Sequence, residues 1–502
     1  RIRPSTSRGT RGERTVRCMA GLGTGVRYGV HCDNLKNMAR GIVERVLYVV
    51  RDGRLVRPPQ PKQCAFARLG SIRKRLLAVL RPTPVVPLDD FPLLYSGRKK
   101  AVYERAVASL KARDVTLRDA WCSTFLKAEK INFDAKGDPA PRVIQPCHPR
   151  YNAALGVYLK PFEKVVLNAF EVVFGYRVVL KGLNASDTAS VMRDNWESFT
   201  RPVAVGLDAS RFDQHVSKLG LQWEHSVYNG AFRCKRLARL LKWQLDNHGV
   251  ARVDGFRVDY HVEGGRMSGI INTGLGNCLL MSSFVLSYVE HHGIKARLSN
   301  NGDDCVLMVE QCDLHKLDGL DQWMLDYGIT LTREPPVDVF ERIEFCQCQP
   351  VYTSTGWRMV RNIWTAPSKD CVSIPGWEDH EAIQAWARNI SGCGLALTTV
   401  VPVWESWYSC LATIGAGARI RGDELEQSGM RFMAAGVIGG RIIPEARVSF
   451  YRAFGITPDQ QVALEHEYGK PIHIQPLTPL TSSHVKAIDI AENPLAALKL
   501  VQ

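Results

Sequence analysis

Residues 298–310 read Leu-Ser-Asn-Asn-Gly-Asp-Asp-Cys-Val-Leu-Met-Val-Glu and contain the most informative acidic residues of the chain. Apolar residues stand on both sides of a polar centre, which predicts two short strands joined by a tight turn. Such a turn favours positive φ, which Gly302 adopts at little cost. We therefore expect a β-hairpin that presents the carboxylates of Asp303 and Asp304 at its tip.

A third carboxylate follows an apolar run at residues 203–207. Asp208 ends this predicted strand, and Asp213 lies five residues further on. If this strand faces the hairpin, its carboxylate meets those of Asp303 and Asp304, and the three would repel one another unless a cation lay between them. Oxygen ligands suit Mg²⁺ or Mn²⁺, and two such ions about 3.5–4 Å apart support nucleotidyl transfer. A Gly-Asp-Asp tripeptide alone, however, is also common in ordinary acidic turns.

A loop of small and polar residues separates the two acidic segments. It reads Ser268-Gly-Ile-Ile-Asn-Thr-Gly-Leu-Gly-Asn277 and leads into a predicted buried helix over residues 277–291. Such a loop can approach a nucleic-acid backbone closely and bond a sugar hydroxyl. The alternative is an ordinary N-capped start of a helix. Apolar spacing predicts further helices over residues 101–111 and 221–248.

The charge of the chain is concentrated near its start. The 502 residues carry 65 Lys and Arg against 50 Asp and Glu, a net charge of +15, and residues 1–100 alone carry 22 against 6. A basic block on a near-neutral body is typical of a polyanion-binding protein. A solubilising leader and an anionic membrane surface are the alternatives. The first seventeen residues, rich in Arg, Ser, Thr and Gly, predict a flexible leader.

Composition excludes several protein classes. With 45% hydrophobic residues the chain is not disordered as a whole, and no apolar run reaches the roughly 18 residues of a membrane-spanning helix. The 14 cysteines have irregular spacing, which favours reduced thiols over a disulfide scaffold or a zinc site. The sequence begins at Arg1 rather than Met, so we expect a fragment or the downstream part of a longer translation product.

The order of these segments resembles motifs A, B and C of viral RNA-dependent RNA polymerases. Asp-x-x-x-x-Asp at Asp208, Ser-Gly-x-x-x-Thr-x-x-x-Asn at Ser268 and Gly-Asp-Asp at Gly302 follow one another in that order. The flanking text resembles most closely the tombusvirus family of positive-strand RNA plant viruses, including its carmovirus-like members, from about residue 25 to at least 351. The segments that carry this likeness are Lys127-Ala-Glu-Lys-Ile, Pro141-Arg-Val-Ile-Gln-Pro, Pro149-Arg-Tyr-Asn, Tyr158-Leu-Lys-Pro and Glu344-Phe-Cys-Gln.

The resemblance implies roles for particular residues. Those matching Asp208 and Asp303 hold two catalytic Mg²⁺ or Mn²⁺ ions, and Asp304 assists from the same turn. A second group is implied to read the ribose 2′-hydroxyl and to select nucleotides, and it comprises Asp213, Ser268, Thr273 and Asn277. A site built to bond a hydroxyl rejects substrates that lack it.

Basic residues complete the implied nucleotide channel. Lys127, Lys130 and Arg142 resemble motif F, which binds nucleoside triphosphate and RNA phosphates. Where related polymerases often carry a motif D lysine, this chain has Arg333, a poor proton donor, so the general acid stays unassigned. Residues 344–349 resemble motif E, which would place Cys346 and Cys348 in a strand.

The resemblance implies an α+β fold of the right-hand polymerase type, with fingers, palm and thumb. The palm would be an antiparallel sheet backed by helices. We expect these divisions: 1–60 basic N-terminal extension or fingertip region, 61–200 fingers, 201–215 palm with motif A, 216–262 fingers insert, 263–350 palm with motifs B to E, and 351–502 thumb and C-terminal tail.

The implied activity is that of an RNA-directed RNA polymerase, a nucleotidyltransferase that copies RNA from ribonucleoside triphosphates by a two-metal-ion mechanism and replicates a positive-strand RNA virus genome. Its partners would be template and nascent RNA, and an upstream viral replication protein or domain that anchors it to host membranes. Replication complexes on membranes in the host cytoplasm would be its location. A catalytically inactive, polymerase-like RNA-binding subunit is the alternative, and reverse transcription is a weaker one.

Overall fold

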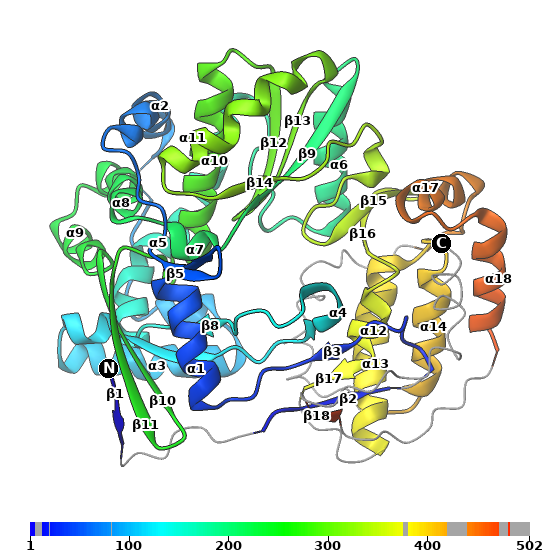
Figure 1. The fold of residues 1–502 in the computed structure, drawn as a ribbon, viewed down its shortest axis with the longest axis horizontal. Coiled ribbons are helices and arrows are strands. Elements are labelled where there is room, and N and C mark those ends of the chain that lie inside the picture. The colour runs from blue at the N-terminus through cyan, green and yellow to red at the C-terminus, as the bar shows by residue number, and fades with distance from the viewer. Residues whose placement is uncertain are drawn as a thin grey trace.

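The computed structural model describes residues 1–5, 13–19, 21–81, 83–374, 380–418, 439–470 and 480–481. A four-stranded antiparallel sheet occupies the upper part of the view in Figure 1. Its strand order is β12-β13-β9-β14, from β9 (Pro202–Ala209), β12 (Ala296–Asn301), β13 (Asp304–Glu310) and β14 (Leu331–Arg333). The predicted hairpin is confirmed as β12–β13, and Gly302 holds φ at 81° in its two-residue turn.

Helices cover both faces of this sheet because its strands are apolar on both sides. Alternate residues such as Leu207 and Leu307 pack in one core with α10 (Thr273–His291) and α11 (Leu320–Asp326). The residues between them, such as Ala204 and Met308, pack in a second core with α6 (Ala185–Glu197). The prediction of a small antiparallel sheet backed by helices is therefore confirmed, and α10 includes the helix predicted over residues 277–291.

A five-stranded sheet and a group of helices form the left-hand part of the molecule in Figure 1. The sheet has the order β1-β11-β10-β6-β8, from β1 (Ile2–Pro4), β6 (Cys122–Leu126), β8 (Val143–Ile144), β10 (Asp246–Val253) and β11 (Phe256–Glu263). The helices are α2 (Gly70–Val79), α3 (Gly97–Ala112), α5 (Pro149–Phe174), α7 (Phe212–His215), α8 (Lys218–Phe232) and α9 (Lys235–Lys242). The helix predicted over residues 101–111 is confirmed as part of α3.

The helix predicted over residues 221–248 is wrong beyond Lys242. Left-handed Arg233, with φ 50°, ends α8, and α9 then ends before β10 begins at Asp246. Asp254 and Gly255 follow, with φ values of 50° and 74°, and fold β10 back onto β11. Positive φ at both central residues is typical of the two-residue Asp-Gly hairpin turn.

Helices dominate the C-terminal part. The hairpin of β15 (Cys348–Thr353) and β16 (Gly356–Arg361) precedes α12 (Ala366–Asp370), α13 (His380–Thr398), α14 (Trp404–Ile414), α17 (Pro444–Phe454) and α18 (Pro458–Tyr468). The fully buried Trp404 and Trp407 belong to the core that these helices share with α6. The end of the expected C-terminal tail, residues 471–479 and 482–502, lies outside the described residues.

Strands near the start of the chain join the two sides of the molecule, so the prediction of a flexible leader is wrong for its described residues. Strand β1 pairs with β11, while β2 (Thr15–Cys18) pairs with β17 (Val372–Ser373) and β18 (Leu480–Thr481). Strand β3 (Tyr28–Gly29) pairs with β7 (Ile131–Asn132). Figure 1 shows β2 and β3 running along the lower edge towards the C-terminal helices.

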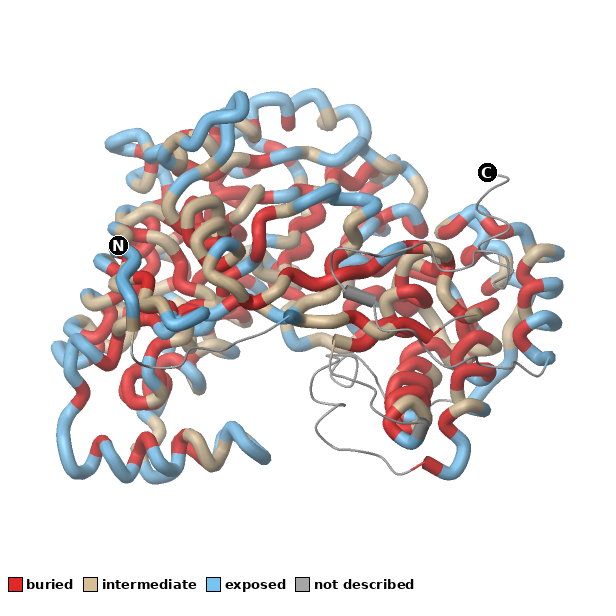
Figure 2. The backbone as a smooth tube through the Cα atoms, turned by 60° about the horizontal axis from the view of Figure 1, so that its bottom comes forward, coloured by how far each residue is buried: buried red, intermediate tan, exposed pale blue. Residues whose placement is uncertain are grey.

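Buried stretches of the backbone run through the middle of the molecule, while exposed stretches follow its outline (Figure 2). Shorter elements complete the described chain. These elements are α1 (Leu35–Ile42), η1 (Val43–Leu47), β4 (Val49–Arg51), β5 (Arg54–Val56), η2 (Ala65–Leu69), η3 (Phe91–Leu94), η4 (Leu117–Ala120), α4 (Phe133–Lys136), η5 (Gln311–Gly319) and η6 (Phe340–Arg342). Within the described ranges, no helix has both the length and the apolar character needed to cross a bilayer.

Candidate active site

Strand register brings the three predicted aspartates together. On β13, Asp304 is the pairing partner of Asp208 on β9. Directly paired residues on antiparallel strands project on the same face, about 4.5–5.5 Å apart, and like charges in such a pair destabilise the sheet. Asp303 precedes this pair in the hairpin turn. The register thus crowds carboxylates where sheet stability alone would disfavour them.

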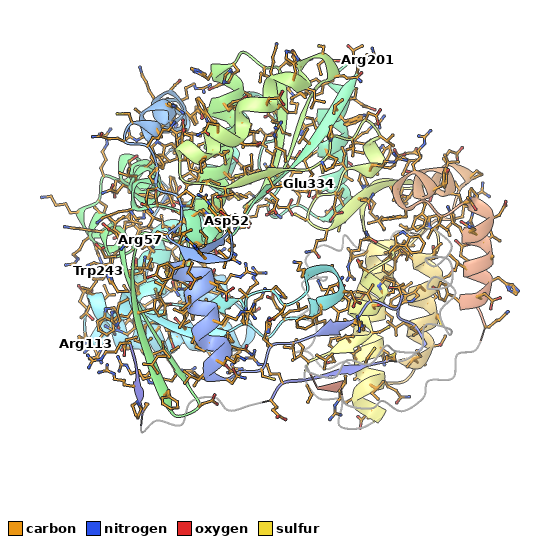
Figure 3. All side chains as sticks on the ribbon, in the orientation of Figure 1. Asp52, Arg57, Arg113, Arg201, Trp243 and Glu334 are labelled. Carbon is orange, nitrogen blue, oxygen red and sulfur yellow. The ribbon has the colours of Figure 1, made fainter. Side chains whose placement is uncertain are left out.

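The three aspartates line one cavity of about 220 Å³, which we call the acidic cavity. Its other lining residues are Gly206, Leu207, Cys305, Glu334, Glu344, Cys346 and Gln347. Glu334 directly follows β14 and is labelled near the centre of the view in Figure 3. Two glutamates therefore join the predicted aspartates, and neither was singled out from the sequence.

Burial and mutual repulsion disfavour ionisation in the acidic cavity. Burial raises the pKa of Asp303, and Asp213 and Asp208 raise it further, whereas Arg142 lowers it. Burial and Asp303 also raise the pKa of Asp304, against a hydrogen bond of 3.1 Å that the Cys346 backbone N–H donates to its Oδ2. The carboxylates are held without enough positive charge around them, which is the environment that a divalent cation would relieve.

We expect Asp303→Asn to raise the melting temperature at pH 7 in buffer without divalent ions. The raised pKa means that the ionised carboxylate is less stable in the fold than in the unfolded chain, and asparagine removes that penalty. The gain should shrink as the pH falls through the raised pKa of the folded state and vanish below the ordinary value of 3.8, because the aspartate is then protonated in both states. Thermal unfolding across pH measures this, with Asp52→Asn in the exposed β4–β5 turn as control. A lower melting temperature for Asp303→Asn would contradict this account.

Three of the four residues predicted to read the sugar form one hydrogen-bonded set. Ser268 Oγ donates to Asp213 Oδ2 at 2.6 Å, and Asn277 Nδ2 donates to Asp213 Oδ1 at 2.8 Å. The fourth residue lies apart from them, since Thr273 Oγ1 donates to the carbonyls of Met267 and Ile270 at 2.9 Å each. The Thr273 hydroxyl thus closes the loop at the start of α10. The alternative of an N-capped helix start is not met, because no side chain caps this helix.

A second cavity, of about 260 Å³, adjoins the acidic cavity and shares Asp208 and Asp303 with it. We call it the arginine-lined cavity, because Arg45, Arg142, Arg211 and Arg266 line it together with Lys136, Asp213 and Ser268. Burial, together with repulsion from Arg211 and Arg142, lowers the pKa of Arg45 to about 10. Cations that repel one another make this cavity suited to an anionic ligand, beside the hydrogen-bonded set of Asp213, Ser268 and Asn277.

Sequence reasoning missed Arg45 and Arg211. Arg45 lies in η1, far from any motif, and only the basic character of residues 1–100 pointed towards it. Arg211 lies inside the segment between Asp208 and Asp213, and its left-handed backbone, with φ 48°, begins α7. No spacing rule indicated that either guanidinium would face the aspartates.

The three predicted motif F cations have different surroundings. Arg142 lines the arginine-lined cavity, and Lys127 lies beside Glu129, with Nζ and Oε2 2.8 Å apart. Lys130 belongs to the lining of neither cavity: its Nζ donates to the Lys369 carbonyl at 2.7 Å and lies 4.9 Å from the centre of the Trp386 ring. Burial lowers the pKa of Lys130 to about 8. Its contacts join the loop after β6 to the C-terminal part.

Arg333 is held by carboxylates, and of the two cysteines only Cys348 lies in a strand. Arg333 Nε donates to Asp321 at 2.9 Å, and its Nη1 lies 3.3 Å from Asp318, so this guanidinium is held on the η5–α11 side. The expectation that Cys346 sits in a strand is wrong. Cys346 and Gln347 have φ values of 52° and 61° and form the turn that leads into β15, which begins at Cys348.

The acidic cavity fits divalent cations only in part without substrate. Among the residues that the structure describes, no three His, Cys, Asp or Glu side chains converge to form a complete metal cage. Mg²⁺ is commonly bound by one or two carboxylates together with substrate phosphates and water, so a complete protein cage is not required. Asp208, Asp303 and Asp304 supply carboxylates of the right kind on one face of the sheet.

Comparison with known proteins agrees with this geometry. Residues 2–473 match the family described as "Viral RNA dependent RNA polymerase". The RNA-directed RNA polymerase of Turnip crinkle virus is 44% identical over 460 residues, 90% of this chain and 59% of that protein. Those of Cucumber necrosis virus and Pothos latent virus are each 44% identical over 457 residues, which cover 90% and 91% of this chain and 56% and 61% of the respective relatives.

The chain therefore spans somewhat more than half the length of these relatives. Their identity over nine-tenths of this chain confirms the resemblance to tombusviruses and carmovirus-like viruses that the motifs indicated. The family match also extends through the C-terminal part, where the sequence offered no motif. Taken with the paired aspartates and the adjoining arginine-lined cavity, these matches establish that the chain belongs to the family of viral RNA-dependent RNA polymerases.

Proposed function

We propose that the chain catalyses template-directed RNA synthesis from ribonucleoside triphosphates and so replicates the genome of a positive-strand RNA plant virus. One observation carries the proposal: Asp208 is paired with Asp304, next to Asp303, at a cavity that adjoins the arginine-lined cavity. Metal-binding carboxylates and phosphate-binding cations on neighbouring surfaces are what transfer of a nucleotidyl group requires.

Asp208, Asp303 and Asp304 would hold two Mg²⁺ or Mn²⁺ ions in the acidic cavity. When bound, the ions would lower the pKa of the RNA 3′-hydroxyl and stabilise the leaving pyrophosphate. The protein keeps the two strands in register, and Cys346 N–H fixes the orientation of Asp304. The raised pKa values of Asp303 and Asp304 support this role, because their carboxylates lack nearby positive charge.

The hydroxyl-bonding set of Asp213, Ser268 and Asn277 would read the ribose. A 2′-hydroxyl can both donate to a carboxylate and accept from an amide or hydroxyl. Thr273 would support this set indirectly, by holding the loop that carries Ser268. The phosphates of the nucleotide would lie against Arg45, Arg142 and Arg211, with Lys127 at the edge.

We expect Arg45→Gln to lower kcat/KM for nucleoside triphosphates about tenfold, because a charge-assisted hydrogen bond to phosphate is lost. Steady-state incorporation with varied nucleotide concentration measures it. Arg54→Gln, an exposed arginine in the neighbouring strand β5, is the matched control and should behave like the unaltered chain. Equal values for the two variants would contradict the assignment of phosphate binding to Arg45.

The right-hand arrangement of fingers, palm and thumb belongs to this proposal. The four-stranded sheet would be the palm, formed by residues 201–215 and 263–350. Residues 61–200 and 216–262 would form the fingers, residues 351–502 the thumb and tail, and residues 1–60 a fingertip region. Pairing of β2 with β17 supports a bridge between fingertips and thumb.

Template and nascent RNA would be the macromolecular ligands. An upstream viral replication protein or domain would anchor the chain to membranes in the host cytoplasm. The family assignment and the basic first hundred residues support both proposals.

Incorporation of labelled ribonucleotide on a short RNA template, with Mg²⁺, with Mn²⁺ and with neither, tests the proposed function. We expect incorporation only in the presence of a divalent ion. RNA binding without incorporation under any of these conditions would overturn the proposal and favour the inactive RNA-binding subunit.

A further inference from the structure

A buried ion pair lies behind the hydroxyl-bonding set. Glu224, on α8, is 0% exposed, and Arg266, in the loop before α10, is 4% exposed. Arg266 Nη2 donates to Glu224 Oε2, and Nη1 donates to Oε1 at 3.2 Å, so the pair is bidentate. Glu224 Oε1 also accepts from the Tyr228 hydroxyl at 2.9 Å and from Asn272 Nδ2 at 3.1 Å. The carboxylate is fully engaged, and it holds the guanidinium in one place.

The third side of the guanidinium determines which way the Asn277 amide faces. Arg266 Nε donates to Asn277 Oδ1 at 3.0 Å, and Asn277 Nδ2 donates to Asp213 Oδ1 at 2.8 Å. A guanidinium has only donors, and a carboxylate has only acceptors. Turning the amide over would oppose donor to donor and acceptor to acceptor, so one orientation alone satisfies both neighbours. Arg266 thereby presents the amide N–H group to Asp213.

The backbone around the pair is shaped to admit it. The Arg266 N–H donates to the Asp213 carbonyl at 2.7 Å, so the same residue also fixes the chain at Asp213. A Cβ added at Gly276, one residue before Asn277, would lie 2.4 Å from Arg266 Nη2 and 2.5 Å from Glu224 Oε1. Helix α10 therefore leaves room for the pair at the one turn that carries Asn277.

Stability alone is a weak reason for such a pair. Removing two charges from water costs free energy that their attraction offsets only with good geometry, and apolar replacements are often equally stable. The pair does, however, constrain a polar set that must be aligned before a ligand arrives. Groups that bond a ligand are effective when their own partners hold them in the productive orientation.

We infer that Glu224 and Arg266 are positioning residues for sugar selection, acting through the orientation of Asn277 and the placement of Asp213. The inference rests on the proposed function, because it assigns the selectivity of that same site to a pair of which only Arg266 reaches the cavity lining. Neither residue needs to touch the nucleotide for this role.

Arg266→Lys tests the inference. Lysine keeps the charge beside Glu224, but a single ammonium replaces the planar fork that bonds Glu224 and Asn277 together. We expect the ratio of kcat/KM for a ribonucleotide to that for its 2′-deoxy analogue to fall about tenfold, as for loss of one hydrogen bond to a charged group. Arg150→Lys is the matched control. The side chains of Arg150 and Arg266 are each 3% exposed, and Arg150 pairs with Asp119, outside both cavities. Its ratio should stay unchanged.

A second comparison separates positioning from general loosening of the fold. When Asn277 is already alanine, Arg266 has no amide left to orient. Adding Arg266→Lys to Asn277→Ala should therefore leave the ratio where Asn277→Ala alone puts it, so the two effects should not add. Glu224→Gln and Gly276→Ala should each lower the ratio of kcat/KM for the ribonucleotide to that for its 2′-deoxy analogue. If Arg266→Lys does not fold, these two variants serve as the test in its place. An unchanged ratio in these variants, or an equal fall in Arg150→Lys, would overturn the inference. If Asp213→Ala also left the ratio unchanged, the proposed sugar-reading role itself would fail, so the two failures are distinguishable.

Discussion

Replacing Asp303 by alanine is expected to abolish nucleotide incorporation while RNA binding is largely kept. We expect a loss of about a thousandfold, the upper end of the scale found when a group that stabilises transition-state charge is removed. The reason is geometric: Asp303 lies at the turn where the acidic cavity and the arginine-lined cavity meet, and it lines both. Labelled-nucleotide incorporation and filter binding of a short RNA measure the two properties separately.

The control for this experiment is Asp52→Ala, which alters an exposed aspartate in another tight hairpin turn. It should incorporate nucleotide like the unaltered chain. Incorporation by Asp303→Ala at the level of Asp52→Ala would remove the metal-binding assignment. Loss of both incorporation and RNA binding would indicate instead that the hairpin had lost its structure.

Replacing Asp213 by alanine is expected to relax selection of ribonucleotides over deoxyribonucleotides by about a hundredfold. Sites that bond a substrate hydroxyl discriminate strongly, because their buried polar groups lose partners when the hydroxyl is missing. Asp213 is the member of the set that bonds both Ser268 and Asn277, so its removal leaves both without their shared acceptor. Competing incorporation of matched ribo- and deoxyribonucleotides measures the ratio.

Thr273→Val provides the contrast for Asp213→Ala. The Thr273 hydroxyl bonds loop carbonyls and not Asp213, so its loss should change the ratio less. A larger fall with Thr273→Val than with Asp213→Ala would contradict the indirect role that we propose for Thr273.

The sequence was sufficient to predict three of the four strands of the sheet where the aspartates lie. Residues 203–207 form a continuous apolar run, and residues 298–310 form two such runs with a glycine at the turn between them. The fourth strand, β14, has only three residues and was not predicted. Two Asp-Gly turns, at residues 52–53 and 254–255, carried a similar hairpin signal. The helical reading of residues 221–248 overlooked the second turn and so missed β10 and β11.

Contacts between distant segments lay beyond the sequence. Arg45 lines the cavity of the aspartates because η1 packs against α7. Lys130 lines neither cavity, because the Lys369 carbonyl and the Trp386 ring lie beside its ammonium group. Neither outcome is encoded in the spacing of neighbouring residues. Strands β1 and β2 likewise form only because partners from residues 256–258, 372–373 and 480–481 pair with them, while their own composition is typical of a loose segment.

The pairing of β2 with β17 also has a consequence for how the polypeptide is made. Residues 15–18 leave the ribosome early, whereas residues 372–373 are added only after most of the chain. Strand β2 must therefore remain without its partner β17 until translation is well advanced, and closing so long a loop is slow. Maturation of this chain should accordingly be a late event in its synthesis, completed when the two distant strands meet.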